Sequence, residues 1–154
     1  MAKTILLAVV VCALTAAGST SAATNVSGSY TVTDLGAFNC LPVGARQTRC
    51  DVTGFTSVYE GSLTGVSTVS FVQFIDCARS RTHGQGTETF DGSVAGVGSG
   101  TLTWKISFQA DFDCNTFTVS GFDGKGAITG STGDLAGAHG LLEFTEFDYS
   151  GTLH

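Results

Sequence analysis

The stretch TLTWKISFQADF, residues 101–112, decides the fold, because apolar and polar residues alternate along its whole length. Successive side chains of a β-strand point to opposite faces, so this pattern predicts a long strand with one buried face and one wet face. Trp104 and Phe108 fall on the apolar face, whereas Lys105 falls on the polar one. An amphipathic helix would instead place apolar residues three and four positions apart.

Similar alternation recurs through most of the chain beyond residue 24, and no window of ten residues has helical spacing. The other predicted strands are residues 29–35, 53–63, 69–76, 87–94, 116–122, 126–129 and 141–153. Turns are expected at Asp91-Gly92 and Asp123-Gly124, which are typical turn dipeptides. Seven to eight strands in one domain are typical of a sandwich or a barrel.

A repeated glycine tract favours the barrel. The pattern Gly-x-aliphatic-x-Gly occurs at residues 61–65, 92–96, 126–130 and 133–137. Glycine weakens a strand unless the backbone must bend sharply or approach another segment closely. Closing a sheet of about eight strands requires such bends. We therefore expect an all-β chain forming a single antiparallel eight-stranded β-barrel.

The first residues have the pattern of a secretory signal. Lys3 precedes an apolar run at residues 5–14, and small residues follow it, with cleavage expected after Ala22 or Ala23. The run is well short of the ~20 apolar residues that a membrane span needs. The predicted organisation is a signal peptide over residues 1–22 and a β-barrel domain over residues 23–154, secreted to the extracellular space.

Four cysteines remain after the signal: Cys40, Cys50, Cys77 and Cys114. They show neither a C-x-x-C pattern nor zinc-ligand spacing, and in an oxidising compartment two disulfides are the default. Three pairings are possible. We favour Cys40–Cys50, which closes a turn-rich loop at residues 41–46, so that Cys77–Cys114 joins the ends of two extended segments.

Composition and motifs exclude several functions. Without the signal the chain has six basic and 13 acidic residues, too few positive charges for a basic nucleic-acid surface and the wrong sign for anionic membranes. No nucleophile elbow or phosphate-binding loop is found, so no cofactor is expected. Asp111 and Asp113 imitate the start of a calcium loop, but Thr116 stands where glycine is needed. No metal site is therefore predicted.

Aromatic residues are numerous, with 11 Phe, three Tyr and one Trp. Such side chains either fill an eight-stranded barrel or line a mouth for one apolar ligand. Tyrosine and tryptophan add a polar group to an apolar ring. The candidate ligand-binding residues are Tyr30, Tyr59, Trp104, Phe108 and Tyr149.

Three residues are candidates for acid–base catalysis. Glu60 follows Tyr59 near the centre of a predicted strand. Glu143 and Tyr149 share one face of the strand predicted at 141–153, and alternation alone does not decide whether that face or the opposite one points inward. A carboxyl group inside a bore can act as an acid or base when burial raises its pKa. Glu60, Glu143 and Tyr149 are therefore the catalytic candidates.

The order of the glycine-rich tracts resembles a known family over residues 61–153. The tracts read GSLTGVS (61–67), GTETFDGSVAG (86–96), GSGTLTW (98–104), GAITGSTGDLAGAHG (126–140) and YSGTL (149–153). They resemble the bacterial family called domain of unknown function 3224, and the late tract is similar to the glycine-rich segment of plant dirigent proteins and allene oxide cyclases. The resemblance implies an eight-stranded barrel of the allene oxide cyclase type. Members of that wider group guide radical coupling, cyclise epoxides or catalyse cycloadditions in an apolar bore.

The expected function is that of a secreted, disulfide-stapled barrel that binds or guides a small apolar ligand in its bore. One alternative is a cyclase, isomerase or lyase that uses a buried Glu or Tyr as acid or base. The other is a non-catalytic secreted surface or interaction protein. Because no catalytic constellation is recognisable, binding is favoured over catalysis. The sequence leaves the oligomeric state open.

Overall fold

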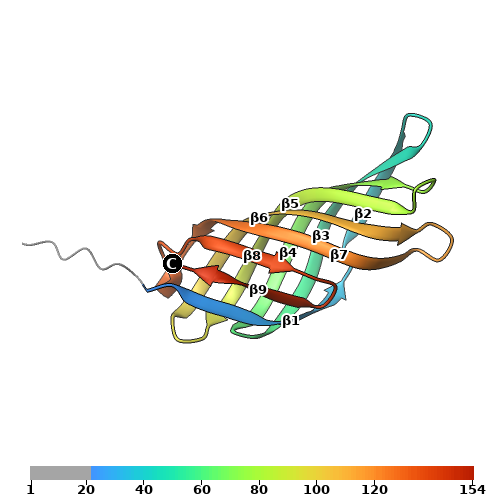
Figure 1. Cartoon of the computed structure of the whole chain (residues 1–154). Coiled ribbons are helices and arrows are strands. Elements are labelled where there is room, and N and C mark those ends of the chain that lie inside the picture. Colours follow the sequence, from blue (N-terminus) through green and yellow to red (C-terminus); the bar gives the residue numbers. More distant parts are fainter. Residues whose placement is uncertain (1–21) are drawn as a thin grey trace, which may run out of the picture.

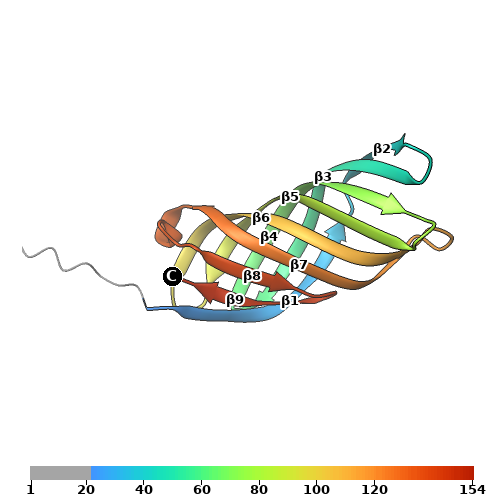
Figure 2. The same cartoon turned by 45° about the horizontal axis from the view of Figure 1, so that its top comes forward.

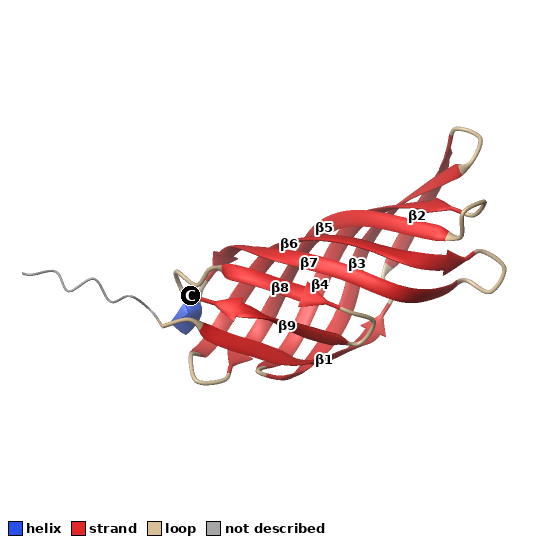
Figure 3. Cartoon of the chain, viewed as in Figure 1, coloured by secondary structure: helices blue, strands red, loops and turns tan. Residues whose placement is uncertain are grey.

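A computed structural model describes residues 22–154, which form nine β-strands and one short 3-10 helix (Figures 1 and 3). The elements are β1 (Thr24–Asp34), β2 (Ala37–Val43), β3 (Gln47–Gly61), β4 (Leu63–Asp76), β5 (Arg81–Val94), β6 (Gly98–Asp113), β7 (Thr118–Ser131), η1 (Gly133–Leu135), β8 (Gly140–Phe144) and β9 (Asp148–Leu153). The expected signal, residues 1–22, lies outside the described residues except for Ala22. None of the described residues belongs to a helix long and apolar enough to span a bilayer.

Eight of the strands form a ring. They follow the order β1-β9-β8-β7-β6-β5-β4-β3, every pairing is antiparallel, and β3 pairs with β1 to complete the circle. β2 is a ninth strand, which pairs with the half of β3 that β1 does not reach. The expected fold class, an antiparallel all-β ring of eight strands stapled by disulfides, is therefore confirmed, and β2 is an addition to it.

The ring is complete at one end and open at the other. β8 and β9 have five and six residues, whereas β7 has 14. Because β8 pairs with residues 124–127 of β7, residues 118–123 of β7 extend beyond it. The β2–β3 hairpin also projects at this end (Figure 2). We call these parts the closed end and the open end.

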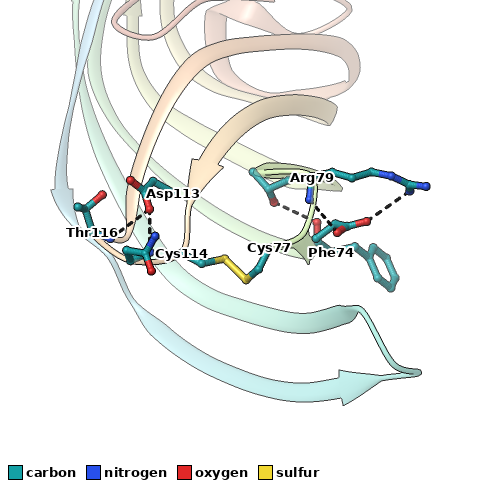
Figure 4. The surroundings of a disulfide bond; sticks show 9 residues. Phe74, Cys77, Arg79, Asp113, Cys114 and Thr116 are labelled. Carbon is teal, nitrogen blue, oxygen red and sulfur yellow. Dashed lines mark hydrogen bonds and ion pairs between the residues drawn. A yellow bond between two sulfur atoms is a disulfide. The ribbon is translucent and has the colours of Figure 1, made fainter.

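Both favoured disulfides are present, and they fit a protein of an oxidising, extracellular compartment. Cys40 on β2 lies directly opposite Cys50 on β3. The segment 41–46, expected to be a turn-rich loop, is half strand, because β2 continues to Val43 and only residues 44–46 form the turn. Cys77–Cys114 joins the turn after β4 to the turn after β6, as expected; Figure 4 shows it between Arg79 and Asp113.

Glycines allow a bulky core at the closed end. Gly65, Gly92 and Gly100 lie side by side across β4, β5 and β6. A Cβ atom on Gly65 or Gly92 would lie 2.9 or 2.6 Å from the ring of Phe90, which is fully buried. Two of the four glycine tracts therefore make room for one core side chain and let the sheet curve tightly.

Two turn predictions are wrong. Asp91-Gly92 lies inside β5, and Asp123-Gly124 lies inside β7, so the two strands expected at 116–122 and 126–129 are one. Conversely, the strand expected at 141–153 is divided into β8 and β9 by residues 145–147. In β7 the glycine serves close packing, because Gly124 is buried beside the ring of Phe122.

Candidate functional site

Four of the five predicted ligand-binding residues meet in the core of the closed end. The Tyr59 ring lies 5.7 Å from that of Tyr30 and 5.4 Å from that of Tyr149, centroid to centroid. It also packs edge to face against Trp104, at 6.1 Å. Tyr59, Trp104 and Tyr149 are buried, and Tyr30 is half-buried. These side chains fill the bore here, so the closed end is packed.

The Tyr149 hydroxyl is held by the main chain. It accepts a hydrogen bond from the Leu63 N–H at 2.6 Å and donates to the Glu60 carbonyl oxygen at 3.2 Å. Burial raises the pKa of the Tyr149 phenol, and the hydrogen bond from Leu63 partly offsets that rise. Tyr149 thus fastens β9 to the turn between β3 and β4 at the point where the ring closes.

The buried acid of the closed end is Glu88, on the inner face of β5. Its side chain is 3% exposed, and it lies directly opposite Trp104 in the β5–β6 ladder. The Tyr59 hydroxyl donates to Glu88 Oε1 at 2.7 Å, and the Trp104 indole N–H donates to Oε2 at 3.1 Å. One carboxyl group therefore joins three strands across the bore.

A fourth polar group completes this cluster. Ser67 on β4 is buried, and its hydroxyl has no hydrogen-bond partner among the described residues. Its position two residues from Val69, which lies opposite Glu88, places it on the same inner face. A buried polar atom without a partner is uncommon and costs about 1–3 kcal/mol.

Burial dominates the protonation of the cluster. It raises the pKa of the Glu88 carboxyl, and the hydrogen bonds from Tyr59 and Trp104 act in the opposite direction. Burial and the nearby Glu88 carboxyl also raise the pKa of Tyr59 and of Tyr30. Both phenols stay protonated near neutral pH, so the cluster has hydroxyl donors beside a carboxyl group that holds its proton more tightly than an exposed one.

Such a pair has the groups required for acid–base chemistry, a carboxyl with a raised pKa and a phenol donor. Access is restricted, however. Gly86 and Gly84 are the next two inward positions of β5 on the open side of Glu88. The Phe108 ring lies over Gly84, Phe71 lies directly beside Gly86, and the rings of Phe71 and Phe108 pack on each other. A molecule that entered from the open end would meet these rings before it reached the carboxyl group.

Phe71 and Phe108 belong to a row of four phenylalanines on the inner face of the open end. Phe55 packs on Phe71 at 5.6 Å, Phe71 on Phe108 at 5.5 Å, and Phe108 on Phe122 at 5.5 Å between ring centroids. We call these four residues the aromatic row. All four are half-buried, so part of each ring faces solvent. Phe108 is the one predicted ligand-binding residue that lies outside the closed core.

Two more apolar side chains share this face. Residues opposite one another in an antiparallel pair point to the same side. Phe38 lies opposite Val52, which in turn lies opposite Phe71. Val32 lies opposite the buried Ser57, on the same face of β3 as Phe55. Phe38 is 48% exposed and Val32 40%. The inner face of the open end is therefore apolar and accessible.

The predicted catalytic glutamates lie elsewhere. Glu60 and Glu143 are exposed, each next to an inward-facing residue, and so lie on the outer face. They border two solvent-open surface hollows of about 540 and 330 Å³ on either side of Asp148 and Tyr149. Neither provides the buried glutamate that the catalytic alternative requires; Glu88 does.

Glu88 could have been found in the sequence. It alternates with Gly86 and Phe90, and period-two counting from the inward Phe90 places it inside. No group of three or more His, Cys, Asp or Glu residues within 22–154 is arranged to hold a metal ion.

Comparison with known proteins supports the fold. No family model matches the chain, and no curated protein matches it. Among solved structures, it is similar to a protein of unknown function from the DUF3224 family of Shewanella oneidensis MR-1. The two share 12% sequence identity with a TM-score of 0.58, over 86% of this chain and 96% of that one. At this identity the likeness concerns the fold alone: the chain has the architecture of a DUF3224 protein.

Proposed function

We propose that this protein is a secreted binding module that holds a small, uncharged apolar ligand against the aromatic row. The observation that carries the proposal is the half-exposed inner face of the open end, formed by Phe55, Phe71, Phe108 and Phe122. Four aromatic rings that remain partly in contact with water lose that contact when an apolar molecule covers them.

The chemistry of the face selects the ligand class. The aromatic row and the Phe38 and Val32 side chains at its rim are apolar, and Gln73, which shares this face, is polar but uncharged. A charged ligand would therefore lose hydration without gaining an oppositely charged partner from these side chains. The bore of the closed end is filled by the protein's own side chains. The proposed site therefore lies at the open end and includes Phe108, whereas Tyr59, Trp104 and Tyr149 belong to the core of the closed end.

Export is part of this proposal. It is supported by the apolar run at residues 5–14 and by the two disulfides.

The experiment is a fluorescence titration with Nile red, a neutral dye that brightens in apolar surroundings. The disulfide-bonded protein should bind it saturably. Phe38→Asp places a charge at the rim of the aromatic row, at a position exposed enough to keep the fold, and should weaken binding by about tenfold, or about 1.4 kcal/mol. The matched control is Leu141→Asp, because Leu141 is 64% exposed and lies on the outer face of β8.

The two variants decide the matter together. Binding that is unaffected by Leu141→Asp and weakened by Phe38→Asp places the ligand at the open end. Equal loss in both variants, or no saturable binding by the wild type, contradicts the proposal.

A second function, cyclisation or isomerisation, is favoured by the Glu88–Tyr59 pair, which supplies a carboxyl with a raised pKa and a phenol donor at 2.7 Å. This function requires the Phe71 and Phe108 rings to separate. It differs from simple binding in that a ligand recovered from the protein would be changed in structure but not in mass.

A further inference from the structure

Two histidines are brought together at the closed end, although 15 positions separate them in the sequence. His139 precedes β8 and His154 follows β9, and they extend the ladder between those strands. The His139 N–H donates to the His154 carbonyl at 3.1 Å, and the His154 N–H donates to the His139 carbonyl at 2.8 Å. Residues that exchange both hydrogen bonds lie directly opposite, so their side chains share a face.

The imidazole rings lie next to each other in solvent. Their centroids are 5.5 Å apart, with 25° between the ring planes, and both residues are exposed. The backbone pairing fixes the two Cα positions, and rotation about χ1 and χ2 decides where the ring nitrogens of these two exposed side chains point. Both rings can thus turn one nitrogen toward a shared point without a change in the sheet.

One ring is already oriented by its surroundings. Nδ1 of His139 lies 3.3 Å from the Gly137 carbonyl oxygen. A carbonyl oxygen only accepts, so Nδ1 carries the proton in this contact and Nε2 presents its lone pair to solvent. Histidines that bind metals commonly donate their other N–H to a backbone carbonyl in this way, which fixes the tautomer and orients the ring.

We propose that His139 and His154 bind one borderline divalent transition-metal ion, with Cu²⁺ held most tightly and Ni²⁺ and Zn²⁺ more weakly. Imidazole nitrogens suit these ions, and affinity for a given nitrogen site follows the order that peaks at Cu²⁺. Ca²⁺ and Mg²⁺ prefer oxygen ligands and should not compete. The protein supplies two ligands, and water fills the remaining positions.

Metal binding would also stabilise the closed ring of strands. The metal would join the chain before β8 to the chain after β9, the two shortest strands of the ring. Because the unfolded chain does not hold the two imidazoles together, the metal would stabilise the folded state.

The test is calorimetric titration of tag-free, disulfide-bonded protein with CuCl₂ in a buffer that does not bind copper. The variants are His139→Gln and His154→Gln. His83→Gln is the matched control, because His83 is the remaining one of the chain's three histidines and is also exposed. Its ring stacks on that of Phe74, at 5.5 Å between centroids, and not on another histidine. All three substitutions are on the surface, and thermal unfolding without metal checks that each variant folds.

The wild type should bind one Cu²⁺ per chain. Even the group that merely orients a ligand commonly contributes tenfold or more, so each of the two substitutions should weaken binding by about tenfold or more. His83→Gln should leave it unchanged.

The electron paramagnetic resonance spectrum gives an independent readout. Nitrogen splittings from two imidazoles are expected in the wild type and from one in either single variant. Three outcomes would overturn the proposal. They are Cu²⁺ binding that is unchanged in both His139→Gln and His154→Gln, an equal loss of affinity in His83→Gln, and displacement of Cu²⁺ by Ca²⁺.

Discussion

Glu88 shows how one residue can govern the behaviour of the closed end. Its carboxyl group is buried, and the two ion pairs in the described part of the chain, Arg49–Asp51 and Arg79–Asp76, lie elsewhere. Burial raises its pKa above the ordinary 4.5. The folded state therefore holds this proton more tightly than the unfolded chain. The resulting stability is full below the ordinary pKa and is lost as pH rises through the raised one.

The substitution Glu88→Gln removes that titration. Relative to the wild type, the free energy of unfolding of the variant should increase as pH rises above the ordinary pKa of Glu88, by at most about 1.4 kcal/mol per pH unit. Urea unfolding between about pH 4 and about pH 8 measures the difference. The control is Glu60→Gln, at an exposed position, for which the difference should stay flat. A flat difference for Glu88→Gln as well would contradict a raised pKa at Glu88.

For single residues, the sequence predicted which side chains lie together better than it predicted what their polar groups do. Tyr30, Tyr59, Trp104 and Tyr149 do lie together, because inward positions of adjacent strands converge in a ring. Their polar groups, however, are bound within the protein. The partner of Tyr59 and Trp104 is Glu88, and which strands adjoin in the ring cannot be read from alternation within a single strand.

Among the elements, β2 differs from the others because one of its edges is free. It pairs only with β3 within the described residues, and all seven of its residues are exposed. Cys40 and Cys50 are 4.0 Å apart between Cα atoms, the short spacing of a pair that does not exchange hydrogen bonds. The backbone groups of Phe38, Cys40 and Pro42 therefore point to the free edge, where Pro42 has no N–H to offer. Proline on an exposed edge hinders pairing with another chain.

Restoring that N–H should promote association. Pro42→Thr adds a donor and a strand-forming side chain at the free edge, so the variant should form more dimer than the wild type at the same concentration. Sedimentation velocity over a range of concentrations measures the change. Ala37→Thr is the control, because the backbone groups of Ala37 point toward β3 and the edge is unaltered. Equal association of the two variants would show that Pro42 does not protect the edge.

The elements that the sequence predicted well are those with one dry face and one wet face. β6 (Gly98–Asp113) contains the whole stretch 101–112, because its apolar side faces the core along its length. β2 lacks that signal, since neither of its faces is buried, and its position depends on the disulfide and on β3. Asp91-Gly92 and Asp123-Gly124 have turn composition, yet ladder pairing keeps them extended, on both sides for Asp91, Gly92 and Gly124 and on the β6 side for Asp123.

The whole molecule combines the closed end and the open end of one ring of strands. At the closed end eight strands and η1 enclose a core that includes Leu135. At the open end residues 118–123 of β7 have no partner from β8, and the turns after β4 and β6 are tied by Cys77–Cys114. The N–H of Phe112, near the end of β6, also donates to the carbonyl of Ser80, in the turn after β4, at 2.9 Å. This disulfide therefore holds together the part of the sheet that carries the aromatic row.

Removing it should cost more than removing the other disulfide. Chain entropy predicts about 4 kcal/mol for the 37-residue separation of Cys77–Cys114 and about 3 kcal/mol for the ten-residue separation of Cys40–Cys50. Urea unfolding of the two double alanine variants measures both losses. Because the loosened strands carry the aromatic row, Cys77→Ala with Cys114→Ala should also weaken Nile red binding, whereas the closed core should keep its protection from hydrogen exchange. A larger loss of stability from the Cys40–Cys50 pair would mean that the projecting β2–β3 hairpin, rather than the tie between the turns, stabilises the open end.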